Sequence, residues 1–313
     1  MANFLVTGAA GFIGSHLAKK LVIDGHQVTT IDNLSTGFIE NIPSGVKFIE
    51  GNDYDPDIIA KLGEQKFDAI FHIAGQSGGM TSFDDPIYDM NSNIASTLIL
   101  LDYAKRTGCN RFIYASSMSV YGDENPCPVT EESEIKPKTF YAVGKLASEH
   151  YMRIYSTFGI RCTSLRFNNT YGIGQNMQNL RQGMVSIFLA QAVNTKRIHV
   201  MGDKERFRDF THVSDNVKAC LLAAQGQEES FYNVYNVCTN RKTTCEELIS
   251  EICKHLPYSV EIEYSGSTPG DQFGIYCDYT KIQEKLGWEP TVQLESGIKE
   301  MVEWALDNKT NNT

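Results

Sequence analysis

The chain has 313 residues, of which 42% are hydrophobic, and its formal net charge is −10 at neutral pH. This length can bury a large core in one big domain or two coupled domains. The acidic balance argues against a nucleic-acid or membrane surface as partner, and no apolar run is long enough to span a bilayer. The eight cysteines have no metal-site spacing, so we expect a reduced, cytoplasmic protein without a metal.

The first predicted strand, residues 3–7, leads into a glycine-rich turn with the spacing Gly8-x-x-Gly11-x-x-Gly14. Residues 15–21 continue with helical periodicity. Glycines in such a turn let the backbone approach a pyrophosphate, which the free N–H groups at the start of a helix can bind. The turn therefore predicts a dinucleotide site.

A second predicted strand, residues 27–31, ends at Asp32. An acidic side chain at this point accepts hydrogen bonds from an adenosine ribose and repels a 2′-phosphate. The sequence therefore predicts NAD as the cofactor and disfavours NADP.

Two further predicted strands carry polar groups. Residues 46–50 are followed by Asn52 and Asp53, which either contact the adenine or only form a turn. Residues 69–74 contain His72, which we expect to be a hydrogen-bonded core histidine. This strand opens into the glycine-rich segment 75–82, which is either a backbone approach to a ligand or a flexible connection.

Next come a predicted helix at residues 91–107 and a strand at 111–115 that runs into Ser117. Tyr141 and Lys145 lie four apart on one helical face, so the ammonium can lower the pKa of the phenol and make it a usable general base. The alternation of helices and strands predicts a doubly wound, Rossmann-type parallel α/β sheet.

These motifs taken together resemble the extended short-chain dehydrogenase/reductases. Within them, the chain resembles the NAD-dependent nucleotide-sugar epimerase/dehydratase family, of the UDP-glucose 4-epimerase type. The matching motifs are Thr7-Gly8-x-x-Gly11-Phe12-Ile13-Gly14, Asp32-Asn33, Ser116-Ser117-x-x-Val120-Tyr121-Gly122 and Tyr141-x-x-x-Lys145. Residues 93–97, 165–172, 208–213 and 286–290 also match family segments, so the resemblance covers nearly the whole chain.

The resemblance implies an NAD-binding Rossmann domain at residues 1–167, to which 209–240 returns. Residues 168–313 would mainly form a smaller domain that binds the nucleotide sugar. Ser117, Tyr141 and Lys145 would be catalytic. The implied cofactor contacts are Gly8, Gly11, Phe12, Ile13, Gly14, Asp32, Asn33, Asn52, Asp53, Ala74, Gln76, Asn93, Tyr141, Lys145 and Phe167. The implied substrate contacts are Ser82, Ser117, Asn169, Arg181, Arg208 and Asp271, with Arg208 holding most of the diphosphate and Arg181 as its substitute.

Departures from the family pattern narrow the expected reaction. Met118-Ser119 stand where dehydratases and decarboxylases of the family carry a carboxylate, and no cysteine follows Ser117 to serve an epimerase/reductase. The expected reaction is therefore 4-epimerisation of a UDP-sugar through a transient 4-keto sugar, with Tyr141 as acid and base. The remaining alternatives are a net nucleotide-sugar oxidoreductase and a non-catalytic dinucleotide-sensing protein.

Other departures leave the substrate open. Thr268 replaces an arginine that usually pairs with the diphosphate, and Asn168 also differs from ordinary 4-epimerases. The Gly75-Gln76 loop resembles that of CDP-tyvelose 2-epimerases, which makes inversion at C2 a further alternative.

The helices at 91–107 and 141–158 have apolar residues on more than one face, and a helix that is apolar beyond one stripe must bury the excess. Relatives pack these helices as a four-helix bundle, so we expect a homodimer.

Overall fold

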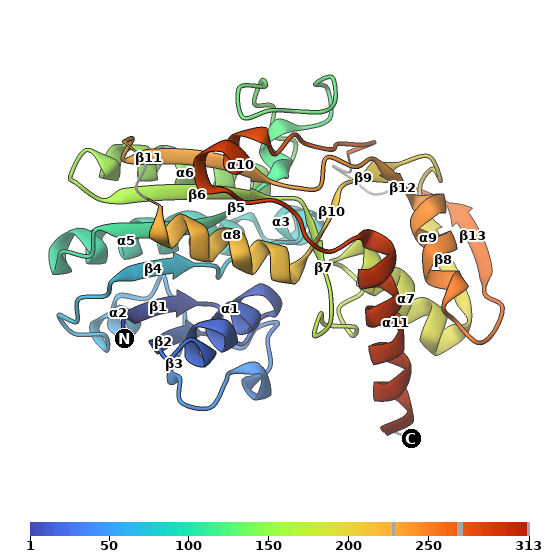
Figure 1. Cartoon of the computed structure of the whole chain (residues 1–313), viewed down its shortest axis with the longest axis horizontal. Coiled ribbons are helices and arrows are strands. Elements are labelled where there is room, and N and C mark those ends of the chain that lie inside the picture. Colours follow the sequence, from blue (N-terminus) through green and yellow to red (C-terminus); the bar gives the residue numbers. More distant parts are fainter. Residues whose placement is uncertain (227–228, 268–271, 312–313) are drawn as a thin grey trace.

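The computed structural model describes residues 1–226, 229–267 and 272–311. Its central feature is a seven-stranded sheet with the order β11-β6-β5-β4-β1-β2-β3, in which all neighbours pair in parallel (Figure 1). The strands are β1 (Asn3–Thr7), β2 (Gln27–Asp32), β3 (Lys47–Glu50), β4 (Ala69–His72), β5 (Arg111–Ser117), β6 (Arg161–Phe167) and β11 (Tyr232–Val237). The Rossmann-type α/β fold predicted from the sequence is confirmed. The strand order reverses direction between β1 and β4, which is where doubly wound sheets bind ligands.

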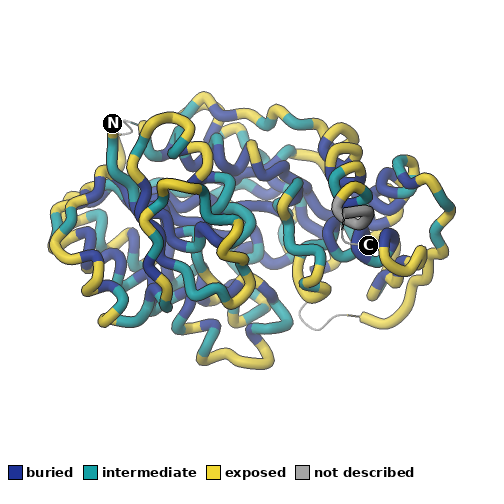
Figure 2. The backbone as a smooth tube through the Cα atoms, turned by 90° about the horizontal axis from the view of Figure 1, so that it is seen from below, coloured by how far each residue is buried: buried dark blue, intermediate teal, exposed yellow. Residues whose placement is uncertain are grey.

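Helices cover both faces of this sheet. One core contains side chains of α1 (Phe12–Ile23), α8 (Val213–Gln225) and α10 (Thr280–Leu286). A second core contains side chains of α2 (Pro56–Ala60), α5 (Ser96–Thr107) and α6 (Phe140–Ser156). Figure 2 shows the buried residues running through the middle of the molecule, with exposed residues at its outer loops. We call the sheet with these six helices the sheet region.

Short helices modify the predicted elements. The helix expected at residues 91–107 begins as a π-helix, η2 (Asn91–Ala95), before α5. Strand β5 continues to Ser117 and β4 already ends at His72. The glycine-rich segment is shorter than expected because α3 (Gly79–Asp84) begins within it. The other short helices are η1 (Ile39–Asn41), α4 (Pro86–Met90) and η3 (Met118–Tyr121).

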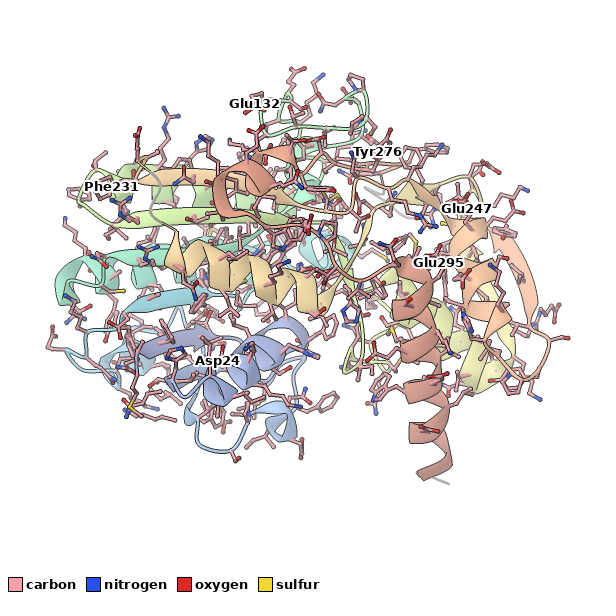
Figure 3. The ribbon with its side chains drawn as sticks, in the orientation of Figure 1. Asp24, Glu132, Phe231, Glu247, Tyr276 and Glu295 are labelled. Atoms are coloured by element: carbon pink, nitrogen blue, oxygen red, sulfur yellow. The ribbon has the colours of Figure 1, made fainter. Side chains whose placement is uncertain are left out.

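The remaining elements form what we call the outer lobe. Its core is built from α7 (Met184–Thr195), β8 (Arg197–Met201), α9 (Cys245–Lys254) and α11 (Leu294–Asn311). β13 (Glu261–Ser265) pairs with β8, and β9 (Phe207–Arg208) pairs with β12 (Thr243–Thr244). Thr244 and Glu247 form a capping box at the start of α9, and Glu295 at the start of α11 pairs with Arg241; Figure 3 labels both glutamates.

The chain passes repeatedly between the two parts. β7 (Asn169–Tyr171) follows β6 directly and pairs in parallel with β10 (Phe210–His212), which leads into α8. α8, β11 and α10 thus belong to the sheet region, although segments of the outer lobe separate α8 from β6 and α10 from β11 in the sequence. Among the described residues, no helix is both long and apolar enough to cross a membrane.

Candidate active site

A cavity of about 460 Å³ opens at the carboxyl edge of the sheet, where the sheet region meets the outer lobe. It is lined by the glycine turn, the ends of β2 and β5, the start of α6 and, from the outer lobe, residues 182–185 and Arg208. Most of the site residues predicted from the sequence line it, namely Gly8, Gly11, Phe12, Ile13, Gly14, Asp32, Asn33, Asn52, Asp53, Ala74, Ser117, Tyr141, Lys145, Phe167, Asn169 and Arg208.

The glycine turn requires glycine for two reasons. Gly8 has φ +78°, a left-handed conformation that favours glycine. A Cβ built on Gly14 would stand 2.1 Å from the carbonyl oxygen of Gly8, so no side chain fits. Gly11, which precedes α1, offers no side-chain cap, and the first turn carries no acidic residue. The N–H groups of Gly8, Ala9, Ala10 and Gly11 already donate within the protein. Those of Phe12, Ile13 and Gly14, the first of α1, have no acceptor within the helix and are available to an anion, so the start of α1 fits a dinucleotide pyrophosphate.

Asp32 is held at the pocket by the backbone. Its Oδ2 accepts from the N–H of Ala10 (2.9 Å) and its Oδ1 from the N–H of Leu34 (2.9 Å). A carboxylate has about four lone-pair sites, so each oxygen can still accept a ribose hydroxyl. Beside it, Asn33 Nδ2 donates to Asn52 Oδ1 (2.7 Å).

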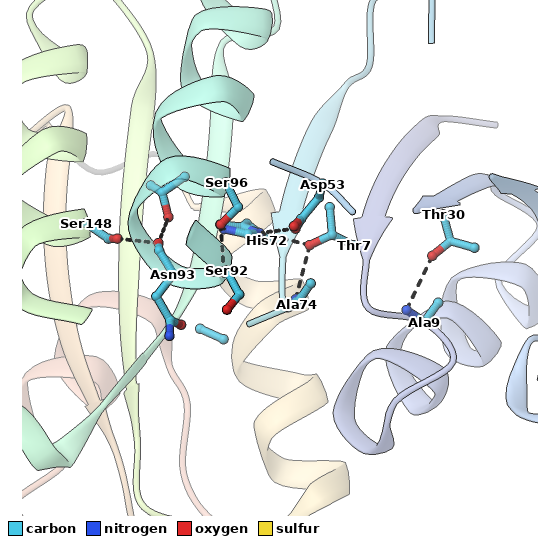
Figure 4. Close-up of polar contacts among 12 residues, drawn as sticks. Thr7, Ala9, Thr30, Asp53, His72, Ala74, Ser92, Asn93, Ser96 and Ser148 are labelled. Carbon is cyan, nitrogen blue, oxygen red and sulfur yellow. Dashed lines mark hydrogen bonds and ion pairs between the residues drawn. The ribbon is translucent and has the colours of Figure 1, made fainter. Parts of the chain in front are cut away.

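His72 is a fully buried core histidine, as predicted. Thr7 Oγ1 accepts from the N–H of Ala74 (3.1 Å) and lies 2.9 Å from His72 Nδ1. Ser96 Oγ donates to the carbonyl of Ser92 (2.8 Å), so it accepts from His72 Nε2 (3.2 Å; Figure 4). Burial lowers the pKa of His72 to about 3, so the ring is neutral.

Asp53 faces the same histidine from the cofactor side. Its Oδ2 lies 3.6 Å from His72 Nδ1, beyond hydrogen-bonding distance, and has no hydrogen-bond partner within the described part of the chain (Figure 4). Burial raises the pKa of Asp53 to about 7. The pocket therefore contains an acceptor that a bound ligand could satisfy.

Ser117, Tyr141 and Lys145 meet at the centre of the cavity. Ser117 ends β5, and the other two lie in the first turns of α6, whose start is capped by Thr139. Lys145 Nζ is 5.6 Å from the centre of the Tyr141 ring and donates to the carbonyl of Ala115 (2.9 Å).

The pKa of Tyr141 is higher than expected from the sequence, where the Lys145 ammonium was expected to lower it. Burial raises the pKa of Tyr141 to about 12, and its hydrogen bond with Ser117 only partly opposes this. Burial also lowers the pKa of Lys145 to about 8. In the protein alone, burial and the charge of Asp89 raise the pKa of Tyr141, and the lowering expected from the Lys145 ammonium is not found.

Arg208 is only 5% exposed and lies at the outer-lobe side of the cavity. Its guanidinium donates to the carbonyls of Phe207 (2.7 Å), Gln272 (2.7 Å) and Phe273 (3.3 Å). Burial lowers its pKa to about 10, so it remains a cation at neutral pH. The backbone carbonyls hold this charge in place beside the pocket.

Other predicted contacts lie elsewhere. Gln76, Asn93 and Ser82 are buried and do not line the cavity. Arg181 is exposed, forms an ion pair with Asp84, and does not line the cavity either. Asp271 and Thr268 lie outside the described residues.

Sequence reasoning missed several polar residues of the site. Lys138, Ser119 and Gln272 line the cavity, and Asp89 lies buried behind it. Lys138 and Gln272 come from irregular segments, where no periodicity indicates a face. Asp89 is the buried residue of the short helix α4, whose other residues are exposed or half-buried, and the sequence gives no sign of this.

Comparison with known proteins agrees with this geometry. The UDP-glucose 4-epimerase of Mycolicibacterium smegmatis is 34% identical over 307 residues, covering 96% of this chain and 97% of that protein. The structure of UDP-glucose 4-epimerase from Thermotoga maritima with UDP-glucose has 34% identity and a TM-score of 0.94, covering 98% of this chain and 99% of its own. The Thermus thermophilus UDP-glucose 4-epimerase complex with NAD has 30% identity and a TM-score of 0.90, covering 96% and 98%. A model of the NAD dependent epimerase/dehydratase family matches residues 4–238, and the chain therefore belongs to that family.

Proposed function

We propose that the protein is an NAD-dependent UDP-sugar 4-epimerase. The observation that carries this proposal is the convergence of Ser117, Tyr141 and Lys145 on the same cavity that the glycine turn lines. Bound NAD would supply the chemistry of accepting a hydride from a sugar carbon and returning it. The Thermotoga and Thermus relatives, crystallised with UDP-glucose and with NAD, support the same assignment.

The residues of the chain have distinct tasks in this reaction. Tyr141 takes the proton of the 4-hydroxyl during oxidation and returns it during reduction, while Ser117 holds that hydroxyl by a hydrogen bond. Lys145 stabilises the phenolate by its positive charge. Met118 and Ser119 place no carboxylate beside the sugar, so elimination of water and decarboxylation lack an acid or base there. The reaction is therefore limited to oxidation and reduction of one carbon.

The outer lobe would hold the nucleotide sugar. Arg208 lies at the cavity as a fixed cation, and a guanidinium pairs well with a diphosphate. Asn169 lines the cavity at the start of β7. We thus assign residues 1–167 and 209–240 to NAD binding, and residues 168–313 mainly to the nucleotide sugar.

The test is to incubate the purified protein with UDP-glucose, UDP-galactose and their N-acetylhexosamine analogues, and to follow the products by NMR. We expect interconversion at C4 without accumulation of NADH. Steady NADH formation would instead identify a net oxidoreductase, and inversion at C2 with a CDP-sugar would identify the alternative epimerase. NAD binding without any turnover would favour a dinucleotide sensor.

We also propose a homodimer. α4 exposes Ile87 (63%) and Met90 (43%), and α6 exposes Val143 (49%) and Ile154 (56%). An apolar face of this kind indicates a protein interface. A second copy packed on α6 and α4, next to the helix predicted at residues 91–107, would bury it. Val143→Lys should convert the dimer to a monomer in light scattering, whereas a wild-type monomer at micromolar concentration would contradict the proposal.

The state of the cysteines bears on the cellular location. All eight cysteines are free thiols, as in proteins of reducing compartments, and we therefore propose a cytoplasmic enzyme. Cell fractionation that recovers it with the membranes or outside the cell would contradict this.

A further inference from the structure

A buried carboxylate, Asp89 of α4, lies behind the cavity and has no part in the reaction as described so far. It is 1% exposed. Its Oδ1 accepts from Gln76 Nε2 (2.8 Å) and from Asn93 Nδ2 (3.2 Å). Asn93 Nδ2 also donates to the carbonyls of Asp89 (3.2 Å) and Gln76 (3.0 Å). Because an ionised carboxylate only accepts hydrogen bonds, these contacts fix which side of the Asn93 amide faces Asp89.

The fixed orientation has a consequence for the other side of the amide. Asn93 is fully buried, and its Oδ1 has no hydrogen-bond partner within residues that the structure describes. A Cβ built on Gly75 would stand 2.6 Å from Asn93 Oδ1 and 3.3 Å from Lys145 Nζ. The unsatisfied acceptor and the ammonium thus lie beside the same glycine. An unsatisfied buried acceptor is rare and calls for a functional explanation.

The backbone around Asn93 supports such a role. Asn93 lies in the π-helix η2, and π-turns inside helices are frequent at functional sites. Its carbonyl accepts from Ser148 Oγ (2.8 Å) of α6 and from Thr97 Oγ1 (2.7 Å), which anchors this turn to the helix that carries Lys145 (Figure 4). The turn is thus held rigidly against α6.

Charge also connects Asp89 to Lys145. Burial lowers the pKa of Lys145 to about 8, and Asp89 is the largest of the acidic influences that oppose this, ahead of Asp53 and Glu149. Glu149 is already engaged by Arg166 Nη2 (2.7 Å). The uncharged rings of Tyr114 and Tyr141 lie 4.7 and 5.6 Å from Nζ.

We propose that Asp89 is a positioning residue of the epimerase reaction: it orients Asn93 so that an acceptor faces Lys145, and its negative charge keeps Lys145 protonated. A protonated Lys145 stabilises the phenolate of Tyr141. Asp89 acts on the reaction through Lys145, and this effect opposes its own direct charge effect, which raises the pKa of Tyr141. The proposal rests on the proposed function, in which Tyr141 is the acid and base.

The test is Asp89→Asn, which keeps the shape of the side chain and removes its charge. In the NAD-loaded protein labelled with ¹³C at lysine Cε, NMR follows the titration of Lys145, assigned by its absence in Lys145→Met. We expect the pKa of Lys145 to fall by about one unit, and the alkaline limb of kcat to move down by the same amount with NAD content unchanged. The matched control is Asp102→Asn, an exposed carboxylate on α5, which should leave the Lys145 titration unchanged.

An unchanged Lys145 titration in Asp89→Asn overturns the proposal, whatever happens to activity. Should that variant fail to fold, Gln76→Met removes one donor to Asp89 without changing any charge. We then expect a smaller shift in the same direction, and an unchanged titration again overturns the proposal. Failure of the proposed function is a separate result, since a wild-type protein without epimerase activity still reports the Lys145 titration.

Discussion

The two ends of the cavity are built in different ways. At the cofactor end, the pyrophosphate would meet backbone N–H groups of one continuous turn, in which the glycines at positions 8 and 14 are fixed by conformation and space. At the substrate end, Arg208, Lys138 and Gln272 come from segments far apart in the sequence. The cofactor end thus depends on local backbone geometry, and the substrate end on how the outer lobe packs.

The two ends of the cavity should therefore tolerate substitutions differently. A local backbone turn keeps its ligand as long as its glycines remain, whereas side chains brought together by packing can change one at a time. We therefore expect substitutions at the cofactor end to affect NAD and those at the substrate end to affect the nucleotide sugar. The following predictions test that separation, beginning with the group that both ends share.

Tyr141→Phe should have the largest effect, because Tyr141 lies where the two ends meet. Loss of the phenolic hydroxyl removes the proton acceptor and little packing, so kcat should fall by about 10²–10⁴-fold while NAD remains bound. Steady-state kinetics and the NAD content of the purified variant measure this. Turnover close to wild type would remove Tyr141 from the mechanism.

Arg208→Ala should raise KM for any accepted nucleotide sugar by about 10- to 100-fold, because a charge-assisted contact to a diphosphate is worth roughly 1.5–3 kcal/mol. NAD affinity should not change if the two ends are separate. The control is Arg181→Ala, an exposed arginine paired with Asp84. The reverse outcome, with Arg181→Ala destroying substrate binding, would transfer the diphosphate site to Arg181.

Asp32 should set the preference for NAD over NADP by roughly tenfold or more, since a carboxylate repels the additional phosphate. Asp32→Asn keeps the acceptor for Leu34 and removes the charge, so NADP affinity should rise while NAD affinity falls slightly. Calorimetric titration of the cofactor-free protein with each dinucleotide checks this. Equal affinities already in the wild type would refute the role of Asp32.

Asp53→Asn should stabilise the cofactor-free protein at alkaline pH. Burial raises the pKa of Asp53 from 3.8 to about 7, so the folded protein holds a proton that the unfolded chain has lost in this window. The free energy of unfolding therefore falls as pH rises from about 4 to about 7. Above pH 7 it stays lower by the same amount.

In melting experiments, Asp53→Asn should exceed the wild type in Tm by a few degrees near pH 8, and the gap should close as pH approaches 4. A gap that widens on acidification would show that Asp53 is stabilised as an anion. NAD affinity should fall in the variant if Asp53 accepts a hydrogen bond from the adenine.

The sequence allowed the sheet, the glycine turn and Tyr141-x-x-x-Lys145 to be predicted because each depends on neighbours within one or two elements. Strand periodicity placed β1 and β2, and helical spacing placed Tyr141 beside Lys145. The elevated pKa of Tyr141 could not be predicted, since desolvation depends on what covers the ring and not on spacing along a helix.

The π-helix and Asp89 escaped prediction for related reasons. Residues 91–95 carry no pattern that distinguishes a π-helix from an α-helix, and the segment packs against α6. For a carboxylate in a short segment such as Asp89, the sequence predicts an exposed, solvated side chain, because most carboxylates are exposed. Its burial results from α3, α4 and α6 closing over it, a contact between segments some fifty residues apart in the chain.

The repeated passage of the chain between the sheet region and the outer lobe limits how the protein can be divided. After β6 the chain runs through β7 to β10, returns to the sheet region with α8 and β11, leaves it for β12, α9 and β13, returns with α10 and ends in α11. Neither part is therefore one contiguous stretch that could be expressed by cutting the gene once. Folding must bring distant segments together before either core closes, which raises the contact order and slows folding. A single break in the polypeptide would consequently disturb both binding ends together, even though each contacts a different ligand.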